Sequence, residues 1–334
     1  MTFNESLYRS LDHIEGYYVS ALVLQLGENG IFELLVDGAT AESIAKEKSM
    51  NEEVLEGVFE FLDVEGIVSI NSGFVSLTEL GKDLFKQRGW YQLLIGGYAP
   101  TFSGLGNILS EGKSAAARNE LMVAVGSGNI DHFDVIPTAK QVIKNLSLQT
   151  RRIVDIGCGT ADCLIELCKE FDVIECIGVS GGEEVSRIAN SLVHEAELEN
   201  RITIRSQDAF SYRTEISPDL ILAAFVLQEI AYQRGMAGLI SFLKRIKHEN
   251  PNSMMMVFEV PKVAPSTPGL RSKSGSYYRS YFLIHALTKQ KLLSIEEWED
   301  VFEKSGYTIR KTEPVSPDYD NSELEVCFVL EPIR

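Results

Sequence analysis

The sequence has 334 residues, of which 45% are hydrophobic and 24% charged, a composition typical of a globular protein of one or two domains. The formal net charge of -17 at pH 7 argues against nucleic acid and anionic membrane surfaces as partners. No apolar run reaches the roughly 18 residues of a membrane-spanning helix, and the first residues lack a secretion signal, so we expect a cytoplasmic protein.

Residues 1–90 are predicted to form a mostly helical domain. The stretch "NEEVLEGVFEFLDVEG" begins with Asn51 as a helix N-cap, has acidic residues in its first turn and stops at Gly66. In "IVSINSGFVSLT", apolar and polar residues alternate around a turn, which indicates a hairpin. Helices followed by a hairpin are typical of a winged helix. The second helix is acidic and contains no Lys or Arg, so we predict dimerisation rather than DNA binding.

The rest of the chain divides into a connector and an α/β domain. Residues 91–150 are rich in glycine and aromatic residues and are predicted to connect the domains and contribute to a substrate pocket. From residue 151 to 334, strands such as "RRIVDIGCG" and "PDLILAAFVL" alternate with helices of 10 to 15 residues. This alternation predicts a parallel, doubly wound sheet, whose ligands bind at the carboxyl ends of the strands.

The stretch "VDIGCGTADC" is a strand followed by Gly157-x-Gly159 and a helix. Glycines at this place let the backbone approach a ligand closely. The stretch is not a dinucleotide fingerprint, since Asp162 stands where the third glycine would be, and it lacks the G-K-[ST] of a phosphate-binding loop.

Taken together, these motifs resemble the class I S-adenosylmethionine-dependent methyltransferases, which implies a Rossmann-like fold and that cofactor. The resemblance implies that Asp155, Gly157 and Gly159 form the loop at the methionine end and that Asp208 in "SQDAF" meets the adenine. Phe225 is counted with these cofactor-binding residues. The family usually has an acidic residue on the ribose where this chain has Ser180. Losing a charge-assisted hydrogen bond costs about 1.5–3 kcal/mol, so either the contact is weaker or Glu183 or Glu184 replaces it.

The N-terminal module resembles that of small-molecule methyltransferases of the plant and bacterial O-methyltransferase type, which implies a homodimer. The stretches "WYQLLIGGYAPT", "VGSGNIDHFDVIP", "FVLQEI", "YYRSYFLIHALTKQ" and "SELEVCFVL" resemble the α-keto-acid C-methyltransferases that act on 2-ketoarginine and phenylpyruvate. This resemblance implies methyl transfer to C3 of a 2-oxo acid through an enolate, whose oxygen needs positive charge or hydrogen-bond donors beside it.

The resemblance also implies a divalent or ferric metal held by two histidines. One of them matches His285 in "FLIHALT", but the other falls on Gln228, which is at best a weak ligand or an amide donor. Glu229 is a candidate base or ligand, or simply an acid at a helix N-terminus. We therefore assign Gln228, Glu229 and His285 to the catalytic corner and leave the metal open.

For the substrate carboxylate, Arg279 in "SYYRSYF" is our first candidate, because a guanidinium binds a carboxylate through two hydrogen bonds. Arg271 and Arg118 are the rival candidates. His132 in "NIDHFD" is predicted to lie in a pocket loop. The tyrosines expected to line the pocket, or to pack between the domains, are Tyr98, Tyr277 and Tyr278.

Two other functions remain open at this point. One is O- or N-methylation of a secondary metabolite, where the absent histidine is no loss. The other is a methyltransferase fold that has turned to non-methylating chemistry, which the joint departures at Ser180 and Gln228 would accompany.

Overall fold

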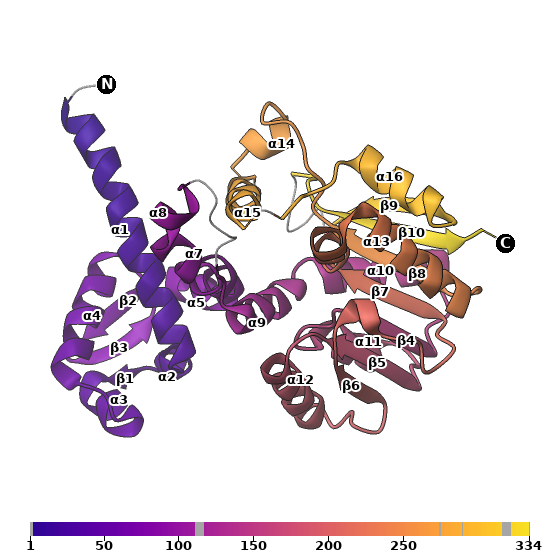
Figure 1. The fold of residues 1–334 in the computed structure, drawn as a ribbon. Helices are drawn as coiled ribbons and strands as arrows, with labels where there is room; N and C mark the ends of the chain where they lie inside the picture. Colours follow the sequence, from indigo (N-terminus) through magenta and orange to yellow (C-terminus); the bar gives the residue numbers. More distant parts are fainter. Residues whose placement is uncertain (1–2, 111–116, 274, 289, 316–321, 334) are drawn as a thin grey trace. The chain divides into compact units, whose positions relative to one another are not determined.

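The computed structural model describes residues 3–110, 117–273, 275–288, 290–315 and 322–333 (Figure 1). The chain divides after Gly97 into two compact units, Met1–Gly97 and Tyr98–Arg334. Each unit has its own hydrophobic core.

The first unit is helical apart from a three-stranded sheet with the order β1-β3-β2. As predicted, Asn51 caps a helix, because its side chain accepts a hydrogen bond from the Val54 N–H at 3.1 Å. The hairpin is confirmed too, and its turn has positive φ at Ser72 (53°) and Gly73 (83°). The elements are α1 Phe3–Glu28, α2 Ile31–Asp37, β1 Ala39–Thr40, α3 Ala41–Lys48, α4 Glu52–Val64, β2 Val68–Asn71, β3 Phe74–Leu77, α5 Glu79–Lys86, α6 Arg88–Trp90 and the π-helix η1 Tyr91–Gly96.

The apolar side chains of α1 differ in how far they are buried within this unit. Val23 and Leu26, near its C-terminal end, are buried in the core with Phe32 and Phe59. Six large apolar residues earlier in α1 are between 45% and 66% exposed, namely Leu7, Tyr8, Leu11, Ile14, Tyr17 and Tyr18.

No single helix of the described residues has the length and apolar character to cross a membrane. Leu7–Glu28 and Ile31–Asp37 meet these criteria only as a pair, bent by 86°.

The second unit is built on a seven-stranded sheet with the order β6-β5-β4-β7-β8-β10-β9. Strands β4 to β8 are parallel, and β10 pairs antiparallel with both β8 and β9. The predicted doubly wound sheet is therefore confirmed, and the structure adds an antiparallel edge to it. The strands are β4 Arg152–Ile156, β5 Glu175–Ser180, β6 Ile202–Ser206, β7 Leu220–Ala224, β8 Met254–Glu259, β9 Tyr307–Pro314 and β10 Val326–Pro332.

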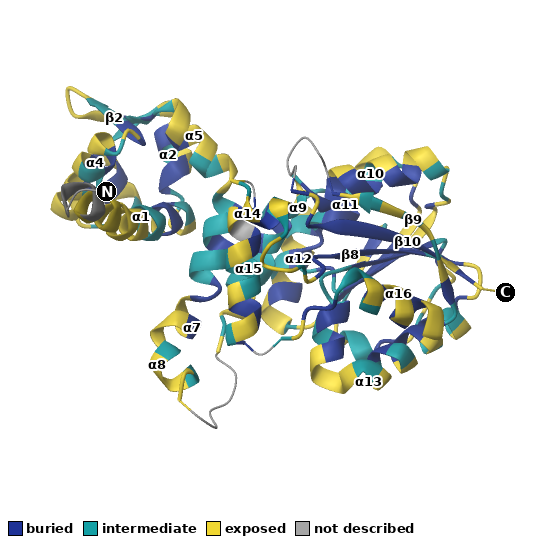
Figure 2. Cartoon of the chain, turned by 90° about the horizontal axis from the view of Figure 1, so that it is seen from above, coloured by how far each residue is buried: buried dark blue, intermediate teal, exposed yellow. Residues whose placement is uncertain are grey.

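Helices cover both faces of this sheet. Residues of α10, α11 and α12 share one core cluster with the strands, and residues of α13 and α16 share the other. Figure 2 shows the result: central strands such as β8 and β10 are buried, while much of the edge strand β9 and the outer faces of the helices are exposed. The helices of this unit are α7 Ala99–Ser103, α8 Leu105–Ile108, α9 Glu120–Asp131, α10 Val135–Leu146, α11 Asp162–Glu170, α12 Glu183–Glu195, the short η2 Ala209–Ser211, α13 Leu227–Glu249, α14 Pro268–Arg271, α15 Ser276–Leu287 and α16 Ile295–Lys304.

The expected connector is more regular than its glycines suggested. Residues 91–96 form η1 of the first unit, and "VGSGNID" ends helix α9 of the second unit instead of forming a loop. Glycine costs a helix about 1 kcal/mol relative to alanine. Here the helix packs so closely that a Cβ at Gly128 would lie 2.2 Å from Thr160 Oγ1. Glycine therefore brings α9 against the loop that follows β4.

Candidate active site

The glycine loop follows β4 at the carboxyl edge of the sheet, as predicted. Gly157 (φ 89°) and Gly159 (φ 52°) both adopt backbone conformations that favour glycine. The N–H groups of Gly157 and Cys158 donate to the carbonyl of Val179 on β5 at 2.9 and 3.0 Å, which fixes the start of the loop.

The two glycines face different surroundings. A Cβ at Gly157 would lie 2.8 Å from Cβ of Val226, so this position is closed by the protein itself. Among the described residues, a Cβ at Gly159 would have only the carbonyl oxygen of Ala124 within 4.0 Å. A substitution of Gly157 thus disturbs packing against the start of α13, whereas the space beside Gly159 is open to a ligand.

Carboxyl groups surround this loop. Asp162 accepts from Thr160 Oγ1 at 2.6 Å and lies 3.2 Å from Nε2 of His132, which raises the pKa of that histidine. Burial raises the pKa of Asp155 to about 7. Burial and the carboxyl groups of Asp134, Asp162 and Asp155 raise the pKa of Asp131. The loop is therefore an acidic environment that favours a cationic ligand group. Through its contact with Asp162, His132 lies beside the glycine loop and not among the residues around Gln228.

The next two strands end in the other predicted cofactor residues. Ser180 ends β5 and is 2% exposed, and its Oγ has no hydrogen-bond partner within the described part of the chain. A buried hydroxyl normally has a partner, so this one is available to a ligand. Asp208 follows β6 and is exposed. One of its oxygens accepts from the Phe210 N–H at 3.4 Å, and Arg234 lies 3.8 Å away.

The stretch "FVLQEI" crosses from strand β7 into helix α13. Phe225 has φ 54°, which is uncommon for a bulky residue and is typical of strained functional positions. Its N–H donates to the carbonyl of Phe258 on β8 at 3.0 Å. The following residues, Gln228 and Glu229, lie in the first turn of α13 at the carboxyl edge of the sheet.

Gln228 lies between two side chains of α15. Its Nε2 donates to Tyr281 Oη at 2.7 Å and lies 3.3 Å from Nε2 of His285. Tyr281 and His285 also pack ring against ring, with centroids 4.0 Å apart. The structure therefore brings together Gln228 and His285, which are 57 residues apart in the chain.

The hydrogen bonds define the protonation of this cluster. His285 Nδ1 lies 2.7 Å from the carbonyl of Tyr281, so it must carry a proton and donate. Burial lowers the pKa of His285 to about 4, so the imidazole is neutral near pH 7 and its Nε2 is an acceptor. The amide of Gln228 then has to present its NH₂ group to His285 and Tyr281. Its Oε1 is buried and has no partner among the described residues.

Glu259, which the sequence pattern did not single out, lies beside this cluster. It ends β8, is 1% exposed, and accepts hydrogen bonds from the backbone N–H groups of Leu227 and Gln228. Its Oε1 has no partner in the described ranges. Burial raises its pKa well above the usual value, and its charge acts on Tyr281. A buried carboxyl with one uncommitted oxygen is a candidate proton acceptor.

Arg118 places a positive charge beside Gln228. Its Nη2 donates to Glu229 at 2.5 Å and its Nε to Glu120 at 2.9 Å, while its side chain is 15% exposed. Burial lowers the pKa of Arg118, but its bonds to the two glutamates outweigh this and raise it. Arg118 also bonds to Tyr98, which is 2% exposed.

Arg279, our first candidate for the carboxylate anchor, has a different position. It is exposed, and its Nη1 donates to the carbonyls of Leu270 and Ser272 at 2.6 and 3.0 Å. These bonds tie α15 to the end of α14, so Arg118 is the better placed arginine. The buried Tyr278 donates to Glu325 at 3.3 Å, and the side chain of Tyr277 lies outside the described residues.

The donor set does not fit a metal held by two histidines. Gln228 and His285 do face each other, but the Nε2 lone pair of His285 accepts from the glutamine amide. In the parts of the chain that the structure describes, no three His, Cys, Asp or Glu side chains are grouped to hold a metal ion.

Comparisons with known proteins agree with this fold. No family model matches the sequence. The 2-ketoarginine methyltransferase of Streptomyces arginensis is 27% identical over 335 residues, covering 98% of this chain and 96% of the relative. The indolepyruvate C-methyltransferase of Streptomyces griseus is 26% identical over 262 residues, covering 77% of this chain and 75% of the relative. The crystal structure of human N-acetylserotonin methyltransferase in complex with S-adenosylmethionine superposes with a TM-score of 0.71, at 16% identity and 98% coverage of both chains.

The chain is an S-adenosylmethionine-dependent methyltransferase. Three features of the methyltransferase at the carboxyl edge of its sheet are compatible with this cofactor. The space beside Gly159 is open, acidic groups surround the glycine loop, and Ser180 has an orphaned hydroxyl. A cationic sulfonium and ammonium group suits the acidic loop, and a ribose hydroxyl suits Ser180.

Proposed function

We propose that this methyltransferase transfers a methyl group to C3 of a small 2-oxo acid, as part of secondary metabolism. The observation that carries the proposal is the Gln228–Tyr281–His285 cluster beside the shielded arginine Arg118. A guanidinium and a set of neutral donors are what a 2-oxo acid and its enolate need. The two keto-acid methyltransferases among the relatives support the same substrate class.

In this proposal Arg118 binds the substrate carboxylate. Its side chain is largely shielded from water, so an ion pair there is stronger than one at the surface. Glu229 holds Arg118 in place and balances its charge. Because Glu229 is engaged by the guanidinium, we assign it to orientation of Arg118 and not to proton transfer.

The 2-oxo group is bound by donors of the cluster. Tyr281 Oη accepts from Gln228, so its own proton is available to the oxygen that becomes negative when C3 loses its proton. The neutral His285 fixes the amide of Gln228, and the amide fixes Tyr281. Bound S-adenosylmethionine supplies an electrophilic methyl group on its sulfonium, for which Asp155, Gly157, Gly159, Ser180, Asp208 and Phe225 are the proposed binding residues.

Glu259 is our candidate for the base that removes the C3 proton. Burial raises its pKa, so that, once it is ionised, its carboxylate is a stronger proton acceptor than an exposed glutamate. The two backbone N–H groups that it accepts from hold one oxygen still, while Oε1 remains uncommitted.

The function is tested by incubating the protein with methyl-labelled S-adenosylmethionine and a panel of 2-oxo acids, phenols and amines. We expect label at C3 of a 2-oxo acid, located by mass spectrometry and NMR. Labelled O-methyl or N-methyl products, with none from 2-oxo acids, would replace this proposal by methylation of another acceptor. Cofactor binding without any methyl transfer would favour non-methylating chemistry.

We also propose that the protein is a homodimer in the cytoplasm, formed largely through the first unit. The six exposed apolar residues of α1, from Leu7 to Tyr18, lie on a helix whose later part is buried in its own core. Such a patch is typical of an interface. We expect light scattering to give twice the monomer mass of 37.2 kDa at micromolar concentration, and a variant with Leu11→Glu and Ile14→Glu to shift to the monomer. A monomer mass for the unchanged protein would contradict the proposal.

A further inference from the structure

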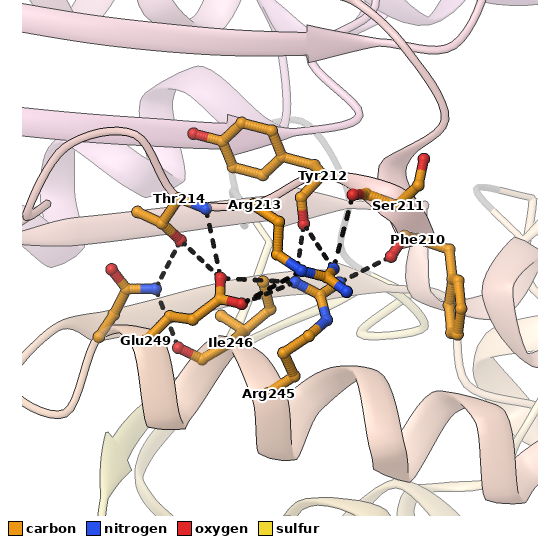
Figure 3. Close-up of polar contacts among 9 residues, drawn as sticks. Phe210, Ser211, Tyr212, Arg213, Thr214, Arg245, Ile246 and Glu249 are labelled. Carbon is orange, nitrogen blue, oxygen red and sulfur yellow. Dashed lines mark hydrogen bonds and ion pairs between the residues drawn. The ribbon is translucent and has the colours of Figure 1, made fainter.

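The loop that follows β6 is tied to the far end of helix α13 (Figure 3). Arg245 donates from Nη2 to the carbonyl of Phe210 at 2.6 Å and from Nη1 to the carbonyl of Tyr212 at 2.7 Å. One turn further along the helix, Glu249 accepts from the N–H and the hydroxyl of Thr214, at 3.2 and 3.3 Å. Two neighbouring side chains of α13 therefore bind this loop at three of its residues.

Other contacts make the attachment a network. Arg245 Nη1 lies 3.3 Å from Glu249, so the two side chains hold each other. Asn250 donates to Thr214 Oγ1 at 2.8 Å and to the carbonyl of Ile246 at 2.9 Å. The side chains of Arg245 and Glu249 are only 20% and 23% exposed. Charge-assisted bonds shielded from water are stronger than exposed ones, so the network holds the loop firmly.

The same loop carries Asp208, the residue that we assign to the adenine. Asp208 opens it and accepts from the Phe210 N–H. The ring of Phe210 stacks on Phe242 of α13 at 5.9 Å, and the guanidinium of Arg234 lies 5.1 Å from the centre of the Phe210 ring. The position of Asp208 and Phe210 thus depends on how this loop is anchored to α13.

We propose that Arg245 is a positioning residue for cofactor binding, acting through the loop of Asp208 and Phe210. The inference rests on the proposed assignment of Asp208 to the adenine. Arg245 touches no cofactor atom in this scheme. Arg245 holds the loop in its binding conformation before the cofactor arrives, so that cofactor binding does not pay the entropy of ordering the loop.

The test is isothermal calorimetry of S-adenosylmethionine and S-adenosylhomocysteine binding to the full-length protein. We expect Arg245→Met to weaken both affinities roughly tenfold, the scale of ordering one or two side chains and a short loop. Arg245→Lys keeps the charge and the stem but loses the planar fork, so we expect a smaller loss of about threefold. Turnover at saturating cofactor should stay within about twofold in both, since the acceptor site is untouched.

Arg201 provides a matched control in the same unit. It donates from Nε to the carbonyl of Val173 at 2.7 Å and from Nη2 to that of Phe171 at 3.4 Å. This loop precedes β5 and so lies at the amino edge of the sheet, away from the ligand edge. Arg201→Met should lower the unfolding temperature as Arg245→Met does, but leave both affinities unchanged.

A double variant shows whether Arg245 acts through Asp208. If it does, adding Asp208→Asn to Arg245→Met should weaken binding by less than the product of the two single effects. Two results would overturn this inference but leave the cofactor assignment intact. One is wild-type affinity in both Arg245 variants, and the other is an equal loss of affinity in Arg245→Met and Arg201→Met. Absence of binding by the unchanged protein would overturn the cofactor assignment and this inference with it.

Discussion

Replacement of Gln228 by alanine should slow turnover of the 2-oxo acid about 100-fold, because the Tyr281 hydroxyl, our proposed donor to the developing oxyanion, loses the amide that fixes it, and losing one such donor typically has an effect of this size. The amide fixes both Tyr281 and His285, so its loss leaves the hydroxyl and the imidazole without their shared partner. The reduction should appear in the turnover number measured at saturating substrate. The affinity for S-adenosylmethionine should be unchanged, because that ligand is assigned to other residues.

Gln228→Glu is the matched control for the role of the amide. It has nearly the same shape but cannot donate to the neutral Nε2 of His285 when ionised, so we expect it to be as slow as Gln228→Ala. Gln228→His should raise the affinity for a transition metal, measured by elemental analysis, because imidazole is a far better ligand than a carboxamide. Near-normal turnover in both Gln228→Ala and Gln228→Glu would remove the amide from the mechanism. A histidine variant that takes up no metal would contradict the facing arrangement of residues 228 and 285.

Replacement of Arg118 by methionine should lower kcat/KM for the 2-oxo acid by about 100-fold, with most of the effect in KM. Methionine keeps much of the apolar stem but removes the charge that we assign to the substrate carboxylate. Truncating one partner of a shielded charge pair typically costs about 2–5 kcal/mol, part of which is the penalty for leaving Glu229 unpaired.

Two comparisons separate substrate binding from that penalty. A methyl ketone without the carboxylate should be a poor substrate of the unchanged protein and should lose little further in Arg118→Met. Arg279→Met removes an exposed arginine that bonds to loop carbonyls, so kcat/KM should stay within about threefold, as is usual for surface changes. A large loss in Arg279→Met, with little in Arg118→Met, would return the anchor to Arg279.

The fold could be predicted because its signals are local in the sequence. Short apolar strands alternate with amphipathic helices, glycines follow the first two strands of this sheet, and parallel strands bring their carboxyl ends to one edge. The same rule predicts Asp155, Ser180, Asp208 and Gln228 at that edge, where the strand ends of the structure lie. The exception was the glycine-rich end of α9, where the contact of Gly128 with Thr160 outweighs the low helix propensity.

The site itself depends on partners distant in the chain, which a single sequence does not reveal. Glu259 ends an apolar strand like many surface acids, and only the pairing of β8 with β10 and the start of α13 bury it. The sequence favours Arg279 over Arg118 as the anchor, and our change of choice rests on Glu229, which is 111 residues from Arg118. Tyr281 has no local signal that marks it, because its partner Gln228 is 53 residues earlier.

The buried hydroxyl of Ser180, at the end of β5, bears on how fast S-adenosylhomocysteine leaves the enzyme. Methyl transfer changes the sulfur but leaves the ribose as it was, so a contact at Ser180 acts alike on S-adenosylmethionine and S-adenosylhomocysteine. A neutral hydroxyl holds a ribose less strongly than the carboxylate common at this position, with a difference of about 1.5–3 kcal/mol. If Ser180 alone binds the ribose, we expect faster departure of the demethylated product and less product inhibition. Ser180→Asp should raise the affinity for S-adenosylmethionine and S-adenosylhomocysteine alike and make S-adenosylhomocysteine a stronger inhibitor of turnover.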